Sequence, residues 1–362
     1  MKQRCAVAQQ YPILDGLSVA SAIGVIIRGT GGRPEAAAPR RVLYGAPSPV
    51  QRLRRLEREL GTSVELYIKR DDALRPLYGN KLRYIEYVLG AYDELAADCI
   101  VHCGGLSSNY LAQLAIAGAE FGIATHLIMN ERRPVSLLGN PLLAEIFGAQ
   151  VHFQLGSCEK LKAELAAQLA QEGLRPLVID APFTNHSAIL GYLQAWRELC
   201  GQVERKEVPM PQHIFLCSAG NSYLGLRIGA DLDGSDVRIT AVSPIRFLDS
   251  GLSVVASDRE GFLRKKIGEF AEFSGQNIPV SKLDVDENFV GASYGAPSSE
   301  SIAAVRLLAR TEGILLDPIY TGKAMAGLLD RIRTRRLPDG ARILFIHSGG
   351  IGNVFSNYDA FA

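Results

Sequence analysis

The stretch Cys99-Ile-Val-His-Cys-Gly-Gly-Leu-Ser-Ser-Asn109 joins a short apolar run to a loop of glycine and polar residues. The same arrangement recurs in Ile214-Phe-Leu-Cys-Ser-Ala-Gly-Asn-Ser222 and in Ile343-Leu-Phe-Ile-His-Ser-Gly-Gly350. Short apolar runs that end at glycine are typical of buried strands. At the carboxyl ends of parallel strands, backbone N–H groups and hydroxyls form anion-binding loops. The three stretches therefore predict an α/β fold with anion sites at strand ends.

Strand-like and helix-like segments alternate along most of the chain, which predicts parallel strands joined by crossover helices. A chain of 362 residues is long enough for two packed domains. Residues 29–40, rich in Gly, Ala and Pro, are expected to form a linker or surface loop. We expect an N-terminal arm over residues 1–40, a large domain built from 41–92 and 200–362, and a small domain over 93–199.

The composition indicates a globular protein without a general affinity for nucleic acid or membranes. Apolar residues make up 47% of the chain, charged residues make up 21%, and the net charge is +1. No run approaches the ~20 apolar residues that a membrane-spanning helix needs. The apolar run 17–27 is flanked by Asp15 and Arg28, which argues against a signal peptide. We therefore expect a cytoplasmic protein.

The six cysteines are scattered along the chain, and three of them lie in apolar strand-like runs. In a chain of this length, such a pattern predicts reduced, buried thiols rather than a disulfide framework. Cys99, His102 and Cys103 do not have the spacing of a zinc site, because positions 102 and 103 of a strand point to opposite faces. We expect no bound metal.

One lysine stands in a distinctive setting. Lys81 lies in Tyr78-Gly-Asn-Lys-Leu-Arg83, where Gly79 and Asn80 interrupt the chain just before a helix expected over 82–95. The helix macrodipole disfavours a cation at this position and so favours the neutral, nucleophilic amine. Such an amine near anion-binding loops is suited to forming a Schiff base with a phosphorylated aldehyde cofactor. By spacing alone, Lys81 is equally consistent with an ordinary surface lysine.

The polar residues of the loops have an ordinary explanation as well. Ser and Asn are strongly preferred as helix N-caps, and helices are expected to follow both 104–109 and 218–222. Taken singly, each loop is explained by capping at least as well as by ligand binding. Three such loops together favour binding, because ligands of open α/β sheets collect at the carboxyl ends of the strands.

Four motifs between about Arg41 and Gly350 belong to one pattern. They are Ile68-Lys-Arg-Asp-Asp72 followed by Gly79-Asn-Lys-Leu-Arg83, then Gly104-Gly-Leu-Ser-Ser-Asn109, then Glu312-Gly-Ile-Leu-Leu-Asp-Pro-Ile-Tyr-Thr-Gly-Lys-Ala-Met-Ala-Gly327, and the stretch 343–350. Together they resemble the pyridoxal-phosphate enzymes of the 1-aminocyclopropane-1-carboxylate deaminase and D-cysteine desulfhydrase family. The resemblance implies the tryptophan-synthase-β type of fold (fold type II): two open parallel or mixed sheets with pyridoxal 5′-phosphate between them.

The resemblance also implies a role for each matching residue. Lys81 would bind the cofactor covalently and move the proton at the substrate Cα. Asn109 would bond the 3′-oxygen of the pyridine ring, and Thr321 would contact its nitrogen. The other cofactor contacts would be Asn80 and the phosphate-binding residues Ala219, Gly220, Asn221 and Ser222. The substrate would be bound by Ser107, Ser108, Asn109 and Tyr110, with Ser108, Tyr294 and Tyr320 in catalytic roles beside Lys81.

Thr321 indicates the type of reaction. A carboxylate at this position would keep the pyridine nitrogen protonated and strengthen the cofactor as an electron sink. A neutral hydroxyl suits β-elimination, in which a good leaving group departs early. Thr321 therefore points to the desulfhydrase branch rather than to the ring-opening deaminase.

Several positions depart from the family pattern. The departures are Ser107 for Gln, Tyr110 for His or Gln, Leu111-Ala112 for a nearby Arg or Thr, Tyr84 for a second lysine, and Asn221 for Gly or Ser. They predict a changed substrate preference, with D-cysteine and 1-aminocyclopropane-1-carboxylate as poor substrates.

The sequence thus predicts a pyridoxal-phosphate-dependent lyase. It would catalyse α,β-elimination from a small amino acid, with D-cysteine-like substrates first, and release a 2-oxo acid and ammonia. The alternatives are a 1-aminocyclopropane-1-carboxylate deaminase, a β-replacement synthase of a non-proteinogenic amino acid, and a non-catalytic protein that binds pyridoxal phosphate. A homodimer is expected.

Overall fold

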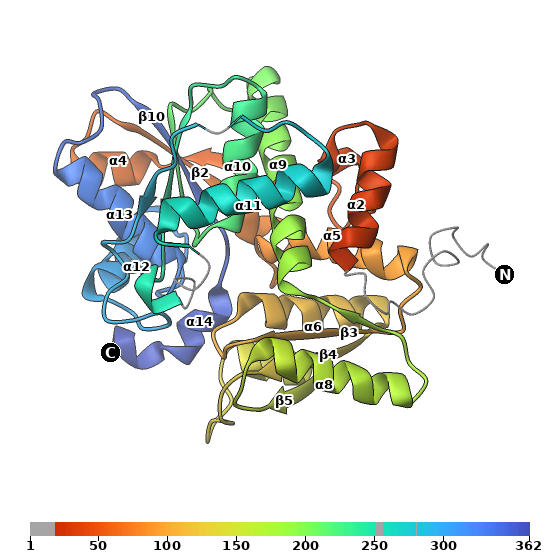
Figure 1. Cartoon of the computed structure of the whole chain (residues 1–362). Coiled ribbons are helices and arrows are strands. Elements are labelled where there is room, and N and C mark those ends of the chain that lie inside the picture. Colours follow the sequence, from red (N-terminus) through yellow and green to blue (C-terminus); the bar gives the residue numbers. More distant parts are fainter. Residues whose placement is uncertain (1–18, 251–255, 280) are drawn as a thin grey trace. The chain divides into compact units, whose positions relative to one another are not determined.

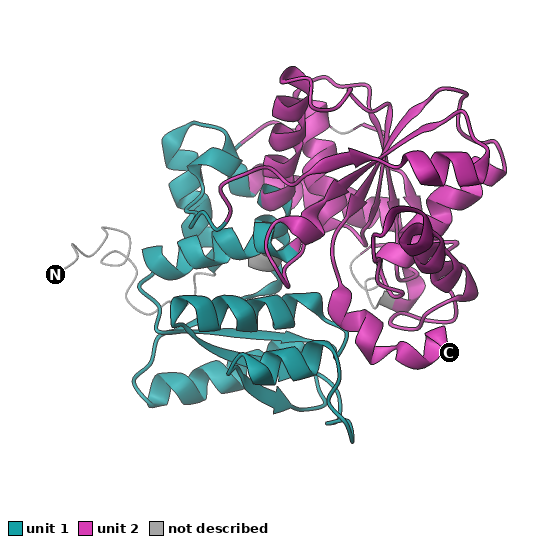
Figure 2. Ribbon diagram, turned by 180° about the vertical axis from the view of Figure 1, so that it is seen from behind, with its two compact units in different colours: residues 1–43, 81–190, 273–275 teal, residues 44–80, 191–272, 276–362 magenta. Residues whose placement is uncertain are grey.

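The computed structural model describes residues 19–250, 256–279 and 281–362 (Figure 1). The chain divides into two compact units (Figure 2). Unit 1 contains residues 1–43, 81–190 and 273–275, and unit 2 contains residues 44–80, 191–272 and 276–362. The sequence-based domains place 81–92 in the large domain, whereas contacts group these residues with unit 1. The domain assignment itself stays a prediction, and its residues 1–18 lie outside the described residues.

Unit 1 is built on a four-stranded parallel sheet. Its strand order is β5 (Gln150–Phe153), β4 (Ala124–Met129), β3 (Cys99–Gly104) and β6 (Pro176–Val178). The chain adds strands first on one side of β3 and then on the other. Right-handed crossovers therefore place α6 (Asn109–Phe121) and α8 (Cys158–Gln171) on opposite faces (Figure 1). The other helices are α2 (Val19–Thr30), α3 (Pro34–Ala37), α5 (Lys81–Glu94) and α7 (Asn140–Ile146).

Unit 2 is built on a six-stranded mixed sheet. Its strand order is β1 (Val50–Arg52), β2 (Glu65–Arg70), β10 (Arg342–His347), β7 (His213–Cys217), β8 (Arg238–Val242) and β9 (Val285–Asp286). Only β1 runs antiparallel to its neighbour among these described strands. The carboxyl ends of β2, β10, β7 and β8 therefore lie along one edge, as the predicted anion loops require.

Helices cover the sheet of unit 2 and complete its core. Fully buried side chains such as Phe215, Leu316 and Phe345 belong to this core. The helices are α4 (Arg54–Leu60), α10 (Asn221–Leu232), α11 (Arg259–Ser274), α12 (Ser299–Glu312), α13 (Thr321–Arg333) and α14 (Ile351–Ser356). The long helix α9 (Ala181–Glu204) has residues in both units, and short 3₁₀ helices span Asp71–Ala73, Leu248–Ser250 and Tyr358–Phe361.

The predicted α/β fold with two open sheets, one parallel and one mixed, is confirmed. The prediction of a linker over residues 29–40 is wrong in part. Thr30 ends α2, and residues 34–37 form α3, because a proline at the first helical position is already shaped for the helix. Among the described residues, none of the helices combines the length and apolar composition of a membrane-spanning segment.

The prediction of reduced thiols is wrong for one pair. Cys103, at the end of β3, forms a disulfide with Cys158, the first residue of α8. The two positions are 55 residues apart in sequence, so only the packing of α8 on the sheet brings them together. Cys99, Cys200 and Cys217 are thiols that form no disulfide. Burial raises the pKa of Cys99 and of Cys200 to about 11, which keeps both thiols protonated at neutral pH.

Candidate active site

Lys81 is the first residue of α5, one position before the predicted helix start. Its side chain is partly buried, and its Nζ lies 4.7 Å from the centroid of the Tyr84 ring. Tyr84 follows one turn later in α5 and is itself buried. The face of the ring therefore attracts the Lys81 ammonium and restricts where the amine lies.

The two residues before Lys81 are held by the loop that follows β10. The Asn80 amide donates to the Ser348 carbonyl at 3.0 Å. A Cβ on residue 79 would lie 2.5 Å from that same carbonyl oxygen, so only glycine fits there. The Ser348-Gly-Gly350 loop thus binds the chain itself and fixes the Gly-Asn step that leads into Lys81.

The loop after β3 caps α6, and one amide side chain outside the loop arranges it. Ser108 is the N-cap of α6, and its Oγ accepts from the Leu111 amide at 3.4 Å. Asn140 Nδ2 donates to Asn109 Oδ1 at 2.9 Å and to the Ser107 carbonyl at 3.0 Å. Asn140 therefore fixes the amide plane of Asn109. The capping explanation of Ser108 holds and does not exclude a ligand at the same helix start.

Tyr110 lies in the interior of unit 1. Its ring packs edge-on against Tyr84 at 5.9 Å and against His102 at 4.8 Å between centroids. Burial raises the pKa of the Tyr110 hydroxyl. Burial, aided by Lys162, lowers the pKa of His102 to about 3, so this ring is neutral at physiological pH. The predicted substrate contact of Tyr110 stays a prediction, and the described packing gives the residue a core role.

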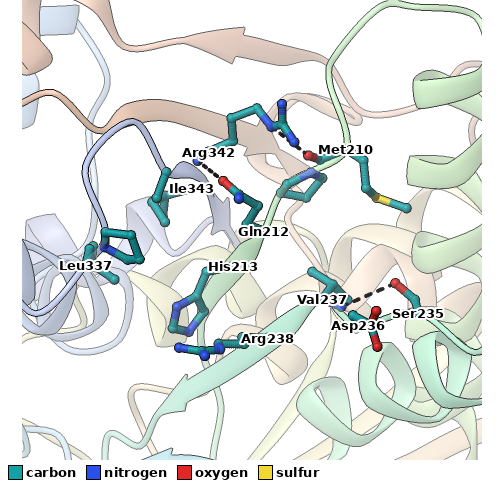
Figure 3. A pocket seen from close by; sticks show the side chains of 13 residues that line it. Met210, Gln212, His213, Ser235, Asp236, Val237, Arg238, Leu337, Arg342 and Ile343 are labelled. Carbon is teal, nitrogen blue, oxygen red and sulfur yellow. Dashed lines mark hydrogen bonds between the residues drawn. The ribbon is translucent and has the colours of Figure 1, made fainter.

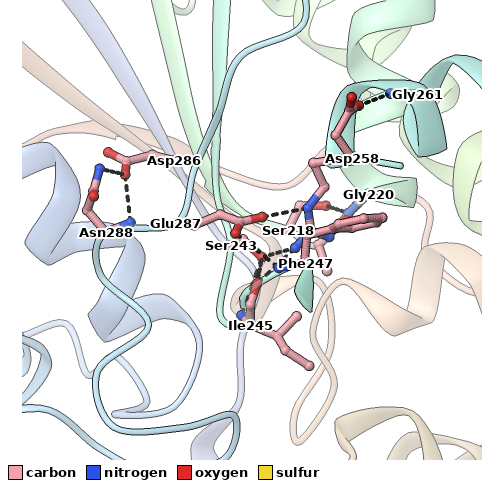
Figure 4. Close-up of polar contacts among 12 residues, drawn as sticks. Ser218, Gly220, Ser243, Ile245, Phe247, Asp258, Gly261, Asp286, Glu287 and Asn288 are labelled. Carbon is pink, nitrogen blue, oxygen red and sulfur yellow. Dashed lines mark hydrogen bonds and ion pairs between the residues drawn. The ribbon is translucent and has the colours of Figure 1, made fainter. Parts of the chain in front are cut away.

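The turn after β7, defined as residues 218–222, includes the first two residues of α10 and is organised by Ser218 (Figure 4). Ser218 Oγ accepts from the Gly220 amide at 3.1 Å, the Tyr223 amide at 3.3 Å and the Ser222 hydroxyl at 3.1 Å. A hydroxyl oxygen has two lone pairs, so these three donors compete for it. The two amides are fixed by the backbone, and the Ser222 hydroxyl is the donor that can rotate toward another acceptor.

Asp317 organises the start of α13 around Thr321. Its Oδ1 accepts from the amides of Ile319 and Tyr320 at 2.9 and 2.7 Å. Its Oδ2 accepts from the amide and the hydroxyl of Thr321 at 2.9 and 2.7 Å. Both residues are buried. Burial raises the pKa of Asp317, although these four donors act in the opposite direction. The Thr321 hydroxyl hydrogen therefore points at a carboxylate, and the oxygen also accepts from the Asp317 amide at 2.9 Å.

Two of the predicted pocket residues form a pair. The hydroxyls of Tyr294 and Tyr320 are 2.8 Å apart, and either oxygen can donate. Tyr294 is 47% exposed, whereas Tyr320 is partly buried at the N-cap of α13. Tyr294 is therefore open to a ligand from solvent while its hydroxyl is hydrogen-bonded to that of Tyr320.

Two other lysines in the matching motifs are engaged elsewhere. Lys69 is buried, and its Nζ binds Glu198 at 2.6 Å and Gln202 at 2.8 Å. Lys323 is buried in α13 and donates to the Ser293 carbonyl at 3.2 Å, and burial lowers its pKa. Of these three lysines, Lys81 alone is the first residue of a helix, and its side chain alone is only partly buried.

The predicted residues are grouped within each unit. Unit 1 contains Lys81 and residues 107–110, and unit 2 contains Asn80, 219–222, Tyr294, Tyr320 and Thr321. Asn140, Asp317 and Arg259, whose side chains bind Asn109, Thr321 and the Ala219 carbonyl, are not among the predicted site residues, and Ser218 is predicted only as part of its loop. For Asp317 a local signal exists, because Asp side chains commonly accept from the amide two residues on, as Asp317 does from Ile319. Asn140 and Arg259 act across long sequence separations that leave no local signal.

A cavity of about 400 Å³ lies at the opposite edge of the unit 2 sheet (Figure 3). His213, Arg238 and Arg342, the first residues of β7, β8 and β10, line it. The 218–222 turn and the 348–350 loop begin at the other ends of β7 and β10. The cavity therefore contains none of the predicted site residues.

Comparison with known proteins supports the family resemblance of the sequence motifs. The family of pyridoxal-phosphate dependent enzymes matches residues 42–349. The chain is 34% identical over 332 residues to a D-cysteine desulfhydrase of Yersinia pestis (strain Pestoides F), covering 88% of this chain and 96% of that protein. It is 33% identical over 333 residues, with the same coverage, to a D-cysteine desulfhydrase of Serratia proteamaculans (strain 568).

Solved structures show the same fold. A crystal structure of an ACC deaminase homologue superimposes with a TM-score of 0.76 at 31% identity, covering 90% of this chain and 96% of that one. Threonine deaminase isoform 2 from Solanum lycopersicum superimposes with a TM-score of 0.58 at 17% identity, covering 84% of this chain and 79% of that one. The fold is that of type II pyridoxal-phosphate enzymes, as predicted.

Proposed function

This chain belongs to the pyridoxal-phosphate dependent enzymes, and we propose that it is a D-cysteine desulfhydrase-like lyase. The proposed reaction is α,β-elimination from a small amino acid, with release of a 2-oxo acid and ammonia. The observation that carries the proposal is the placement of Lys81. It starts α5 directly after a Gly79-Asn80 step that the Ser348 carbonyl fixes, and its amine lies over the Tyr84 ring.

The residues present fit pyridoxal 5′-phosphate. An aldehyde needs an accessible amine, and the Lys81 side chain is only partly buried, whereas Lys69 is fully buried. A phosphate needs convergent donors, and the 218–222 turn places the first amides of α10 beside a rotatable Ser222 hydroxyl. When bound, the cofactor withdraws the electrons left at the substrate Cα after a proton is lost.

We assign the proton transfer at Cα to Lys81. The Ser107-Ser108 step would hold the substrate carboxylate at the start of α6, where the helix N-terminus favours negative charge. Asn109, held by Asn140, would donate to the 3′-oxygen of the cofactor. Together these contacts would fix which bond at Cα is broken, because the carboxylate and the ring are both held.

The remaining assignments concern unit 2. Residues 219–222 would bind the phosphate, and Asn80 would flank the cofactor. Thr321 would contact the pyridine nitrogen by turning toward it the hydroxyl hydrogen that Asp317 accepts in this structure. The hydroxyl pair of Tyr294 and Tyr320 would line the substrate pocket and can pass a proton to a leaving group.

A cytoplasmic location and a homodimer are further parts of the proposal. Sedimentation at several concentrations tests the dimer. The Cys103–Cys158 disulfide argues against a cytoplasmic location, because reducing compartments keep most thiols free.

The test is a spectral and product screen of the purified protein. We expect visible absorbance from bound cofactor, followed by release of a 2-oxo acid and ammonia from at least one small D- or L-amino acid. Product from 1-aminocyclopropane-1-carboxylate, or a β-replaced amino acid formed with an added thiol, would favour the alternative enzymes. Bound cofactor without turnover of any amino acid would favour a non-catalytic binding protein.

A further inference from the structure

Arg259 is a largely buried cation of intermediate exposure that none of the assignments above uses. It is the first residue of α11, and its side chain is only 10% exposed. The macrodipole opposes a positive charge at a helix start. The cap of α11 is supplied instead by Asp258, whose Oδ1 accepts from the Gly261 amide at 2.7 Å. The position of Arg259 therefore calls for an explanation outside its own helix.

The Arg259 guanidinium joins three segments of unit 2 that are distant in sequence. Nη1 donates to the Ala219 carbonyl at 2.9 Å, and Nη2 donates to the Ile245 carbonyl at 2.9 Å. Nε donates to Glu287 Oε1 at 2.7 Å. These partners follow β7, β8 and β9, and Figure 4 shows the segments facing one another. One planar cation thus links three neighbouring strand ends.

The guanidinium is held from two sides. Glu287 Oε2 also accepts from the Phe247 amide at 3.0 Å. The guanidinium carbon of Arg259 lies 5.3 Å from the centroid of the Phe247 ring. An ion pair at the edge and an aromatic ring against the face together fix the plane of the group. A lysine ammonium has no planar fork and could not make the same set of contacts.

The contact with Ala219 holds a peptide that lies inside the 218–222 turn. Arg259 binds the carbonyl of the Ala219–Gly220 peptide, and Ser218 Oγ accepts its N–H at 3.1 Å. With both polar ends held, this peptide cannot rotate, and the amides of Asn221 and Ser222 keep their direction. The ion pair with Glu287 offsets the charge of Arg259, so Arg259 acts on the turn through the geometry of these contacts.

We propose that Arg259 is a positioning residue for the cofactor phosphate. It holds the 218–222 turn in the conformation that binds the phosphate. The inference rests on the proposed function, because it concerns the phosphate of the same cofactor.

The test compares two ligands that differ only in the phosphate. Full-length protein freed of cofactor is titrated with pyridoxal phosphate and with pyridoxal. We expect Arg259→Gln to weaken the affinity for pyridoxal phosphate by about ten- to a hundredfold and to change that for pyridoxal by less than about twofold. Arg259→Lys keeps the charge without the fork, and we expect a smaller loss confined to pyridoxal phosphate.

Arg264→Gln is the matched control. It removes an exposed ion pair with Glu260 in the same helix, and both affinities should stay unchanged. Phosphorus NMR of bound pyridoxal phosphate gives a second readout. Its chemical shift should move in both Arg259 variants and not in Arg264→Gln.

Two results would overturn the assignment. An unchanged affinity for pyridoxal phosphate in Arg259→Gln would mean that the turn does not need the contact. Equal losses for both ligands would mean that Arg259 only stabilises unit 2. If Arg259→Gln does not fold, Arg259→Lys and the phosphorus spectrum decide by the same criteria. Failure of the proposed function is seen separately, as wild-type protein that does not bind pyridoxal phosphate.

Discussion

The amine of Lys81 lies over the ring of Tyr84, and Tyr84 in turn packs against the edge of Tyr110. Tyr84 and Tyr110 are two of the positions at which the sequence departs from the family pattern. Their contact in unit 1 gives a physical reason for the two departures to occur together. At the position of the family pattern's second lysine, the Tyr84 ring packs beneath the Lys81 amine.

This pairing predicts a measurable coupling between the two rings. Tyr84→Leu and Tyr110→Leu should each destabilise the protein, and the double variant should lose less than the sum by about 0.5–1.5 kcal/mol. Urea unfolding of the cofactor-free protein measures the free energies. Additive losses within about 0.3 kcal/mol would show that the rings do not support each other.

The proposed phosphate contact of the 218–222 turn can be tested through the rotatable hydroxyl of Ser222. Ser222→Ala removes one donor to an anion, and a hydrogen bond to a charged group is worth roughly 1.5–3 kcal/mol. We expect the affinity for pyridoxal phosphate to fall about ten- to a hundredfold, as measured by titration of cofactor-free protein. An unchanged affinity would leave the turn as an ordinary helix cap.

The Asp317–Thr321 pair should contribute to stability without any cofactor. Thr321→Val keeps the shape of the side chain but leaves the buried carboxylate without its 2.7 Å donor. We expect a loss of roughly 2–4 kcal/mol in the free energy of unfolding, whereas Thr321→Ser should stay within about 1 kcal/mol. A similar effect of both variants would mean that the hydroxyl bond is not what matters.

The disulfide should stabilise unit 1. It closes a loop across a sequence separation of 55, for which the chain-entropy model gives about 4 kcal/mol. Reduction, or Cys103→Ser, should lower the free energy of unfolding by about 2–4 kcal/mol, with Cys200→Ser as the free-thiol control. Titration of the denatured chain should find two more thiols after reduction than before. Equal thiol counts would contradict the bond.

Local patterns were sufficient for the strands that precede the candidate loops and, to within one residue, for the start of the helix at Lys81. The runs at 99–103, 214–217 and 343–347 alternate with helical segments and end at glycine, so burial and chain reversal are both visible in the sequence. The disulfide, the Asn140 contact and the Arg259 contacts were not visible, because each depends on packing between distant segments. Tyr110 shows the same limit. Its place in a motif suggested a ligand contact, whereas its burial against His102 depends on the fold of unit 1.

The central claim is that Lys81 carries the cofactor. Wild-type protein loaded with pyridoxal phosphate is reduced with borohydride and digested, and the tagged peptide is identified by mass spectrometry. We predict a tag on Lys81 and its loss in Lys81→Ala, together with the loss of turnover. A tag on Lys69 or on Lys323, or an equal tag in Lys81→Ala, would contradict the account.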